Sequence, residues 1–222
     1  MLYLYHKEAA APQLTLLGDD HRYIFKVRRH KVDDTLYLRN LSDGLLHRYT
    51  ITYLDKRSVI LELQESTTHD IKAKNNLHIG WCIIDPKNVE KVLPTLNEMG
   101  VDKITFFYCE RSQKSFQLDF KRLEKILLNS SQQSGRSEMM ILEKAEDLAS
   151  FLKCNPHAKM LNFSEDNFLG STEVETIVIG CEGGFHEEEV ALFHAENIVG
   201  FDTLLVLKSE SAACGVASKI LL

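Results

Sequence analysis

The chain has 222 residues and 44% of them are hydrophobic, which is enough to bury a core and excludes a disordered chain. Its five cysteines are an odd number, far apart, without a CxxC pair or a histidine at metal-ligand spacing, so we expect free thiols in a reducing compartment and no metal site. The sequence has neither an apolar run of membrane-spanning length nor a basic leader, so we expect a soluble, cytoplasmic protein.

The net charge of −6 by itself disfavours a nucleic-acid partner, but the charge is unevenly spread along the chain. Residues 1–75 carry 12 Lys/Arg and 10 Asp/Glu, whereas residues 76–222 carry the remaining 14 and 22. The first part is therefore slightly basic and the second clearly acidic, which indicates two parts of different kind.

The first part of the chain contains short runs rich in β-branched and aromatic residues. We expect strands at 15–17, 35–38, 49–53 and 58–63, separated by turns such as Ser42-Asp43-Gly44. This spacing predicts a small β-barrel over residues 1–70. Residues 66–76 lack periodicity and are predicted to be a linker.

A basic strip lies within this first domain, at His21–Lys31. It carries five formal positive charges and two histidines without one acid. Such a strip is suited to phosphates, with Tyr23 or Phe25 packing or stacking beside them. It is equally consistent with a solvated face whose core residues are Tyr23, Ile24 and Val27. The candidate RNA-binding residues of the strip are Arg22, Lys26, Arg28 and Arg29.

Beyond the linker, strands and helices alternate. A buried strand is expected at 78–84, and Asp85 followed by proline predicts the start of a helix. Pro94 is expected to kink that helix or end it early. A second strand at 103–107 precedes a helix that begins at Asp119.

The remaining elements complete a second domain over residues 77–222. Strands are expected at about 139–142, 158–163, 176–180, 198–201 and 204–207, with helices at about 144–153 and 187–196. This alternation predicts an α/β fold with a largely parallel sheet. Because such sheets bind ligands at their strand ends, most of the function is expected within 176–215.

A glycine loop follows the strand at 176–179, with glycines at Gly180, Gly183 and Gly184. The spacing differs from the G-x-G-x-x-G fingerprint of dinucleotide sites. Glu187–Glu189 fall in the first turn of the next helix, where they would repel a pyrophosphate. A neutral or cationic ligand therefore fits better. A dinucleotide site with Asp202 as the ribose-binding acid and a tight turn without ligand remain alternatives.

Four ordered segments resemble one known family. Gly180–Phe185 with Glu187–Val190 resembles the signature G-P-E-G-G-(F/L)-s-x-x-E of the ribosomal RNA small-subunit methyltransferase E family, which belongs to the SPOUT, or trefoil-knot, methyltransferases. Glu98–Ile104 is similar to its E-L-G-V-x-x-I, Gln132–Arg136 to its E-Q-(S/C)-x-R and Leu207–Ala212 to its L-R-T-E-T-A. The basic segment Phe25–Arg28 also lies where the family has V-L-R, so the resemblance covers essentially the whole chain.

The resemblance implies a PUA-like β-barrel that binds RNA and a trefoil-knotted α/β domain that binds S-adenosylmethionine and forms a homodimer. It also implies methylation of N3 of a uridine in 16S ribosomal RNA of the small subunit. The cofactor would be held largely by main-chain groups of two loops. The residues expected to bind it are Gly180, Glu182, Gly183, Gly184, Val206, Leu207, Ser209 and Ala212.

Methyl transfer to N3 of uridine requires loss of a proton, and the carboxylates nearest the expected crevice are Glu182 and Glu210. Each could equally accept only loop or helix N–H bonds. Lys208, in place of the family's arginine, is the third candidate catalytic residue. Arg136, just after a helix end, is a candidate for RNA contact or an exposed helix-end charge without function.

The chain departs from the family pattern at Cys181, Thr203, Leu205 and Lys208, where members have proline, glycine, arginine and arginine. Lysine keeps the charge of arginine but loses its planar two-pronged contact. A catalytically weakened RNA-binding or ribosome-assembly protein with the same fold therefore remains the alternative function.

Overall fold

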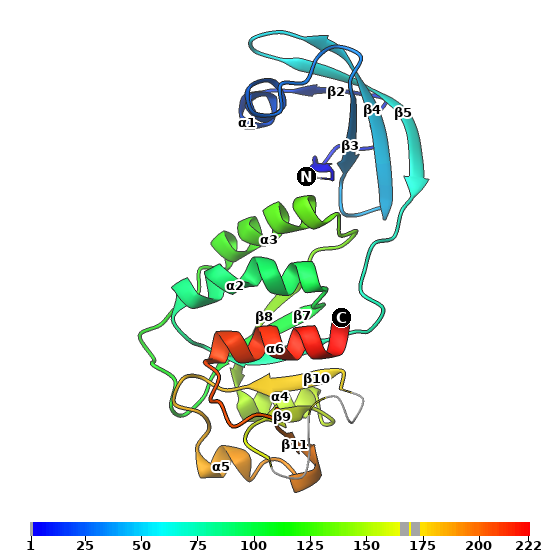
Figure 1. Ribbon diagram of the computed structural model, residues 1–222. Coiled ribbons are helices and arrows are strands. Elements are labelled where there is room, and N and C mark those ends of the chain that lie inside the picture. The colour runs from blue at the N-terminus through cyan, green and yellow to red at the C-terminus, as the bar shows by residue number, and fades with distance from the viewer. Residues whose placement is uncertain (1, 165–168, 170–173) are drawn as a thin grey trace. The chain divides into compact units, whose positions relative to one another are not determined.

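The computed structural model describes residues 2–164, 169 and 174–222, and the chain divides into two units (Figure 1). Unit 1 comprises Met1–Lys72 together with Ser131–Glu138, and unit 2 comprises Ala73–Ser130 and Met139–Leu222. The boundary after Lys72 falls inside the expected linker. The sequence interpretation kept residues 131–138 with the second domain, whereas the structure groups them with the first.

Unit 1 contains a curled, half-barrel sheet of five strands in the order β1-β3-β4-β5-β2. Among the described residues of this sheet, β1 and β3 pair in parallel and the other neighbours pair antiparallel. Alternate residues face the core, so that Leu14 and Leu16 of β2 are buried while their neighbours are exposed. The strands are β1 (Leu4–Tyr5), β2 (Gln13–Leu16), β3 (Thr35–Arg39), β4 (Leu45–Leu54) and β5 (Val59–Thr68).

These strands confirm the four β-rich runs expected from the sequence, with two differences. β5 continues to Thr68, because residues 66–68 pair with the first residues of β4. The first three residues of the expected linker are therefore part of a strand. Between β2 and β3 the chain forms helix α1 (Gly18–Arg22) and the π-helical turn η1 (Tyr23–Val27), which together contain most of the basic strip.

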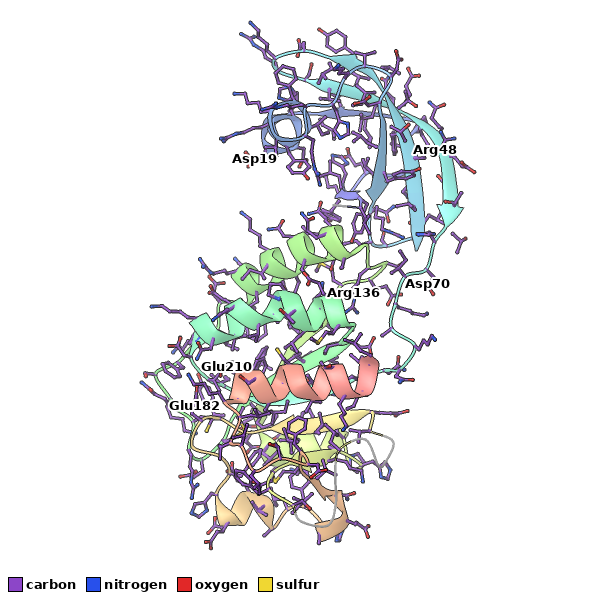
Figure 2. All side chains as sticks on the ribbon, in the orientation of Figure 1. Asp19, Arg48, Asp70, Arg136, Glu182 and Glu210 are labelled. Atoms are coloured by element: carbon purple, nitrogen blue, oxygen red, sulfur yellow. A yellow bond between two sulfur atoms is a disulfide. The ribbon has the colours of Figure 1, made fainter. Side chains whose placement is uncertain are left out.

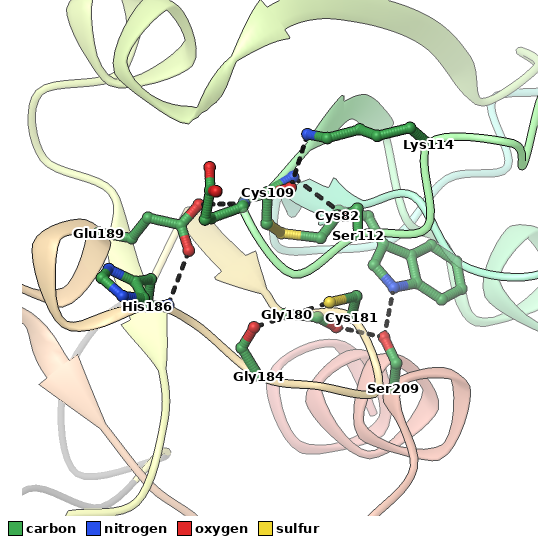
Figure 3. Close-up of a disulfide and its surroundings, with 12 residues drawn as sticks. Cys82, Cys109, Ser112, Lys114, Gly180, Cys181, Gly184, His186, Glu189 and Ser209 are labelled. Atoms are coloured by element: carbon green, nitrogen blue, oxygen red, sulfur yellow. Dashed lines mark hydrogen bonds between the residues drawn. A yellow bond between two sulfur atoms is a disulfide. The ribbon is translucent and has the colours of Figure 1, made fainter.

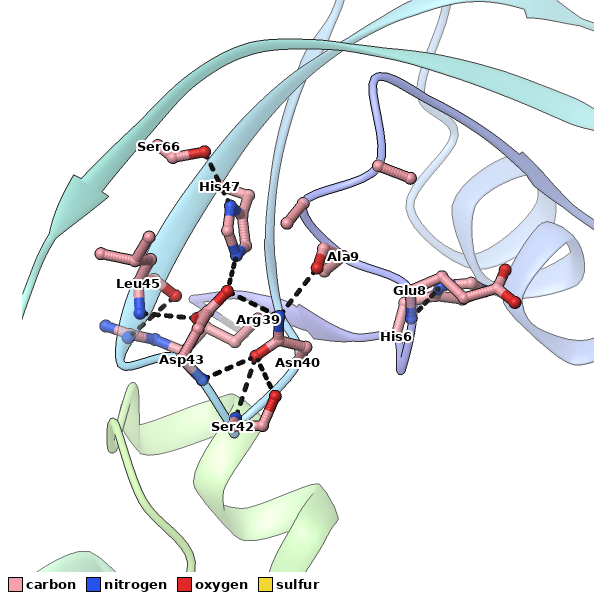
Figure 4. A network of polar contacts seen from close by, with 12 residues as sticks. His6, Glu8, Ala9, Arg39, Asn40, Ser42, Asp43, Leu45, His47 and Ser66 are labelled. Carbon is pink, nitrogen blue, oxygen red and sulfur yellow. Dashed lines mark hydrogen bonds and ion pairs between the residues drawn. The ribbon is translucent and has the colours of Figure 1, made fainter.

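A polar network fixes the turn between β3 and β4 (Figure 4). The Asn40 side chain accepts the N–H groups of Ser42 and Asp43 and donates to the carbonyl of Ala9. His47 is fully buried, and its two ring nitrogens lie 3.0 Å from Asp43 Oδ2 and 2.9 Å from Ser66 Oγ. Because both ring nitrogens have partners, this buried polar side chain stabilises the pairing of β4 with β5.

The segment Ser131–Glu138 belongs to unit 1 through direct hydrogen bonds. Leu2 N–H donates to the Gln132 carbonyl (2.8 Å), and Tyr3 O–H donates to the Arg136 carbonyl (2.9 Å). Ser137 N–H donates to the Ile71 carbonyl, and Ile71 N–H returns a bond to Ser137 Oγ (2.6 Å). Bonds between residues so distant in sequence could not be inferred from local patterns.

Unit 2 is built on a six-stranded sheet in the order β11-β9-β10-β6-β7-β8, and every pairing is parallel. This confirms the predicted α/β fold. The strand order reverses beside β6, with β10 on one side and β7 on the other. The strands are β6 (His78–Cys82), β7 (Lys103–Tyr108), β8 (Ile141–Asp147), β9 (Lys159–Leu161), β10 (Thr176–Ile179) and β11 (Ile198–Val199).

The helices of unit 2 begin where their sequences favour it. Asp85 caps α2 by accepting Lys87 N–H, and Pro86 occupies the first turn. α2 packs against α6 (Figure 1). Phe151 of α4 lies so close to Gly80 that an added Cβ would come within 2.6 Å of its ring. The helices are α2 (Pro86–Met99), α3 (Phe120–Ser134), α4 (Leu148–Cys154), α5 (Glu187–Val190) and α6 (Ser209–Leu221), with a 3₁₀ turn η2 (Ala195–Asn197).

Three expected elements of unit 2 are corrected by the structure. Of the two effects expected of Pro94, the early end of α2 is wrong, because the helix continues to Met99 with Leu93 and Leu96 on either side of the proline fully buried. The expected kink stays a prediction. The helix expected at 144–153 begins only at 148, since β8 continues to Asp147, whose side chain caps α4. The helix expected at 187–196 ends at Val190.

The expectation of five free thiols is wrong for one pair. Cys82 and Cys109 form a disulfide with their Cα atoms 5.7 Å apart (Figure 3). Because β6 and β7 are adjacent and Cys82 is in register with Phe107, Cys109 lies at the same edge of the sheet. The remaining cysteines Cys154, Cys181 and Cys214 are free thiols. The argument from free thiols to a reducing compartment therefore does not hold for this pair.

Within the described part of the chain, no helix is both long and apolar enough to cross a membrane.

Candidate functional site

A cavity of about 950 Å³ opens in unit 2 at the carboxyl ends of β9 and β10, beside the reversal of strand order. Parallel α/β sheets bind ligands at this position. Its walls are the ends of the two strands, the glycine loop and the segment before α6. The lining residues are Leu161–Ser164, Ile179–Phe185 and Phe201–Ser209, together with Ala212.

The cavity brings together all eight residues expected to bind the cofactor. Gly180, Glu182, Gly183, Gly184, Val206, Leu207, Ser209 and Ala212 each line it, as does Lys208. The glycine loop turns at Gly184, whose φ of +69° is in the left-handed region that favours glycine. Gly184 N–H donates to the Cys181 carbonyl (2.9 Å), which closes the turn and leaves main-chain groups at the cavity wall.

Ser209 connects the two loops of the cavity to the central sheet (Figure 3). Its hydroxyl donates to the Gly180 carbonyl (2.5 Å) and accepts the indole N–H of Trp81 (2.8 Å). Trp81 is fully buried on β6, so its N–H has to be satisfied within the protein. The start of α6, the end of β10 and β6 are thus fixed by one side chain.

The acidic helix α5 is held by a capping box. His186 N–H donates to Glu189 Oε2 (2.8 Å), and Glu188 N–H donates to His186 Nδ1 (3.5 Å). The other oxygen of Glu189 accepts Glu110 N–H (3.0 Å) from the loop after β7. Glu187 and Glu188 remain exposed beside the glycine loop, which keeps this edge of the cavity unfavourable for a pyrophosphate.

The strand expected at 204–207 does not exist. Leu204, Leu205 and Val206 are 103%, 74% and 77% exposed and belong to no strand or helix. The apolar run was mistaken for a core strand because composition alone does not distinguish a buried strand from a loop that walls a cavity. Its residues line the cavity instead.

The three candidate catalytic residues differ in their surroundings, and Figure 2 labels two of them, Glu182 and Glu210. Glu182 and Lys208 are exposed and line the cavity. Glu210 is half-buried in the first turn of α6 and does not line it. Its Oε2 atom is inaccessible to solvent and has no hydrogen-bond partner among the described residues. Such an oxygen in a folded protein calls for a donor from outside the chain or from a rearranged neighbour.

The four candidate RNA-binding residues of the basic strip, Arg22, Lys26, Arg28 and Arg29, are all exposed in unit 1. Arg28 is partly engaged, because its Nε donates to Tyr23 O–H (2.5 Å) and its guanidinium lies over the Tyr23 ring. His21 is buried, stacks on Phe25 and places Nε2 2.8 Å from the Asp55 carbonyl. The solvated cations expected of the strip are therefore present. Of its expected core residues, Ile24 is buried and Tyr23 half-buried, whereas the expectation for Val27 is wrong because its side chain is 62% exposed.

The expectation of Arg136 as an exposed charge is wrong. The residue is only 6% exposed in unit 1, and its Nε donates to the Glu138 carbonyl (3.2 Å). The helix end that precedes it is confirmed, since α3 ends at Ser134. Arg136 is therefore buried after the end of α3, and its contact with RNA stays a prediction.

The sequence interpretation missed one wall of the cavity, which consists of Leu161, Asn162 and Phe163 at the end of β9 and of Phe201 after β11. The signal was available, because carboxyl ends of parallel strands meet at one edge of the sheet. Recognising it required the position of β9 next to β10, which the chain order does not provide.

Comparison with known proteins first defines the class. Residues 72–221 match the family described as the RNA methyltransferase domain. A solved ribosomal RNA small subunit methyltransferase E from Neisseria gonorrhoeae, bound to S-adenosyl methionine, has the same fold, with a TM-score of 0.79, 19% identity and coverage of 98% of this chain and 95% of that one. A protein of Legionella pneumophila solved with bound SAM has a TM-score of 0.80 at 21% identity, with coverage of 99% and 96%.

The particular family follows from a more similar relative. The chain is 37% identical over 222 residues to the ribosomal RNA small subunit methyltransferase E of Helicobacter pylori, with 98% of each chain covered. This chain therefore belongs to the ribosomal RNA small subunit methyltransferase E family.

Proposed function

We propose that this protein uses S-adenosylmethionine to methylate N3 of a uridine in 16S ribosomal RNA of the small subunit. The observation that carries the proposal is the single cavity lined by all eight residues expected to bind the cofactor. Membership of the family supports the reaction class. Two relatives of the same fold are described as bound to S-adenosyl methionine, which supports the choice of cofactor.

The chemistry of the cavity fits this cofactor. Main-chain groups of the glycine loop and the apolar segment 204–207 offer a wall for a neutral adenosine. Glu182 and Asp202 supply carboxylates for a cationic group, whereas Lys208 is the only Lys or Arg in the described lining. A dinucleotide, which the glycine loop left as an alternative, would place a pyrophosphate against these acids.

The protein's main task is to align the reactants and exclude water, which contributes several kcal/mol in such reactions. When bound, S-adenosylmethionine supplies an electrophilic methyl group. The uridine N3 proton must pass to a base, and we propose that Glu182 or Glu210 accepts it. Glu210 has an unpartnered carboxylate oxygen, and Glu182 lines the cavity. Lys208 then orients an anionic oxygen of the substrate by its charge.

We further propose that unit 1 is a PUA-like domain that contacts RNA through the basic strip, and that unit 2 contains a trefoil knot and forms the homodimer. The ribosomal substrate, rather than the cysteines, is the basis for proposing a cytoplasmic location. If the knot is present, deleting Ala213–Leu222 removes the segment that is threaded through it. A truncated protein that still bound the cofactor would contradict the knot.

The reaction is tested with small ribosomal subunits that lack the modification and S-adenosylmethionine labelled in its methyl group. Nucleoside analysis of the 16S RNA should yield 3-methyluridine. Loss of the general base should lower the methylation rate by a factor of about 10²–10⁴. The variant that shows this loss, Glu182→Gln or Glu210→Gln, identifies the base. Glu188→Gln, at an exposed glutamate, is the matched control. Methyl groups on another atom would refute the uridine-N3 assignment.

One observation favours a second function. Leu205 replaces an arginine of the family pattern and is 74% exposed at the cavity, so a cation is missing there. A protein that binds cofactor and RNA but transfers no methyl group would be the catalytically weakened RNA-binding or ribosome-assembly protein. The methylation assay separates the two functions directly.

A further inference from the structure

Three exposed cations lie on the loop after β7 and on the neighbouring strand β8. They are Arg111, Lys114 and Lys144. Lys114 Nζ and Lys144 Nζ lie 5.3 and 5.6 Å from the centroid of the same ring, that of Tyr108. Among the described residues, none of the three cations forms an ion pair with a carboxylate. Such a group stands out where residues 76–222 carry 14 Lys/Arg against 22 Asp/Glu.

The loop that carries Arg111 and Lys114 is bonded to the cavity wall. Arg111 Nη1 donates to the carbonyl of Gly183 (2.9 Å), which lines the cavity. The adjacent Glu110 N–H donates to Oε1 of Glu189, and the other oxygen of the same carboxylate caps α5. Arg111 and Lys114 are therefore held in a fixed relation to the glycine loop.

The loop is also braced internally (Figure 3). Cys109 is fixed by its disulfide, and its N–H donates to Ser112 Oγ (3.0 Å). Lys114 Nζ donates to the Cys109 carbonyl (3.0 Å), which uses one of its three N–H donors. Arg111 likewise uses one of five donors on Gly183. Most of the donors in this group therefore remain for an anion from outside the chain.

Acids near the group limit its strength without cancelling it. Glu110 and, on β8, Glu146 and Asp147 are exposed. The Asp147 carboxylate accepts Ser150 N–H at the start of α4, which directs it towards the helix. A phosphodiester group carries a single negative charge. The three cations without carboxylate partners therefore have enough positive charge to bind one or two phosphodiester groups.

We propose that Arg111, Lys114 and Lys144 form a phosphate-binding site of unit 2 that holds the backbone of the substrate RNA beside the cavity. The site rests on the proposed function and deepens it by adding an RNA contact on the acidic unit, distinct from the basic strip of unit 1. Arg111 has a second effect as a positioning residue, because its bond to Gly183 fixes the glycine loop.

The site is tested by equilibrium binding of purified small ribosomal subunits over a range of KCl concentrations, with S-adenosylhomocysteine present. The double variant K114A/K144A should bind about tenfold more weakly. The slope of log K against log salt should become shallower by about 1.4, because each single-strand phosphate contact contributes about 0.7. Its affinity for S-adenosylhomocysteine should stay within about twofold of the wild type. The control is K125A, because Lys125 is exposed on α3 and forms no ion pair with the described residues.

A structural role for the two lysines gives a different result. K114R/K144R keeps both charges and should restore the affinity and the salt slope. If K114A/K144A leaves the slope unchanged, or if the arginine variant fails to restore it in a folded protein, the phosphate site is refuted.

Arg111 is tested separately because it has two effects. R111A should weaken both RNA and cofactor binding, whereas R111K should retain most of the RNA affinity and lose cofactor affinity about threefold or more, since lysine cannot reproduce the geometry at Gly183. Unchanged cofactor binding in R111A would refute the positioning effect. The two proposals fail in different experiments. If the proposed function is wrong, the wild-type protein does not methylate the subunits. The binding series of the variants tests the phosphate site whatever the result of the methylation assay.

Discussion

At the scale of single residues, the cavity depends on side chains that satisfy buried groups rather than on reactive ones. Ser209 is the clearest example, since one hydroxyl serves both the Gly180 carbonyl and the Trp81 indole. Threonine occupies this position in the family pattern that the sequence resembles, and it carries the same hydroxyl. The hydroxyl, rather than the size of the side chain, is therefore the required feature.

Replacing Ser209 by alanine leaves the indole N–H of Trp81 buried without a partner and releases the carbonyl of Gly180. We expect S209A to lower the free energy of unfolding by about 1–3 kcal/mol and to weaken S-adenosylhomocysteine binding. Urea unfolding and calorimetry measure the two effects. S209T retains the hydroxyl and should remain close to the wild type; equal losses in both variants would rule out this explanation.

At the scale of elements, β6, β7 and β8 share a partly buried polar cluster at their amino ends. His78 Nε2 lies 2.8 Å from Thr105 Oγ1, and Lys103 pairs with Glu143 across β7 and β8 (2.7 Å). Burial, and then the positive charge of Lys103, lower the pKa of His78 to about 4, although Glu143 opposes this. His78 is therefore neutral in the folded protein at pH values where an unfolded chain would protonate it.

This shift gives the stability a pH dependence of known sign. The unfolded state binds the extra proton between about pH 6.5 and 4, so the contribution of His78 is complete above about 6.5 and is lost as the pH falls towards 4. We expect a loss of about 1–2 kcal/mol after allowing for solvent screening of the partly buried ring. Urea unfolding of the wild type and of H78Q from pH 4 to 7.5 isolates the contribution of His78. If the free energies of unfolding of the two proteins change in parallel with pH, the prediction is contradicted.

The sequence predicted elements well where the pattern was local. The capped start of α2 at Asp85 and the glycine loop after β10 follow from residues within a few positions of one another. The parallel sheet follows from the alternation of strands and helices along the chain. The strand expected at 204–207 was wrong because an apolar run carries no information about which surface it covers. The Cys82–Cys109 disulfide was missed because it depends on the adjacency of β6 and β7.

At the scale of the whole molecule, the chain order does not match the division into units. Ser131–Glu138 lies within the second half of the sequence but belongs to unit 1. Arg136 was expected to contact RNA or to be an exposed helix-end charge, yet it is buried. Only the long-range bonds to residues 2, 3 and 71 reveal this role, and no local pattern encodes them.

Deleting residues 1–72 should therefore damage more than unit 1. The buried polar residues Gln132, Arg136 and Ser137 would lose partners such as Leu2, Tyr3 and Ile71. We expect the fragment 73–222 to melt several degrees below the full chain and to lose protection from amide exchange first at 131–138. Calorimetry and hydrogen exchange by mass spectrometry test this. An unchanged exchange rate at 131–138 would show that this segment is stable without unit 1.

We propose that the cavity at the carboxyl ends of β9 and β10 is an S-adenosylmethionine pocket. The most direct test is a calorimetric titration of the full-length protein with S-adenosylmethionine, S-adenosylhomocysteine and NAD. We predict micromolar binding of the first two ligands and none of NAD, because the acids beside the glycine loop repel a pyrophosphate. Binding of NAD, or of none of the three ligands, would contradict the assignment of the cavity.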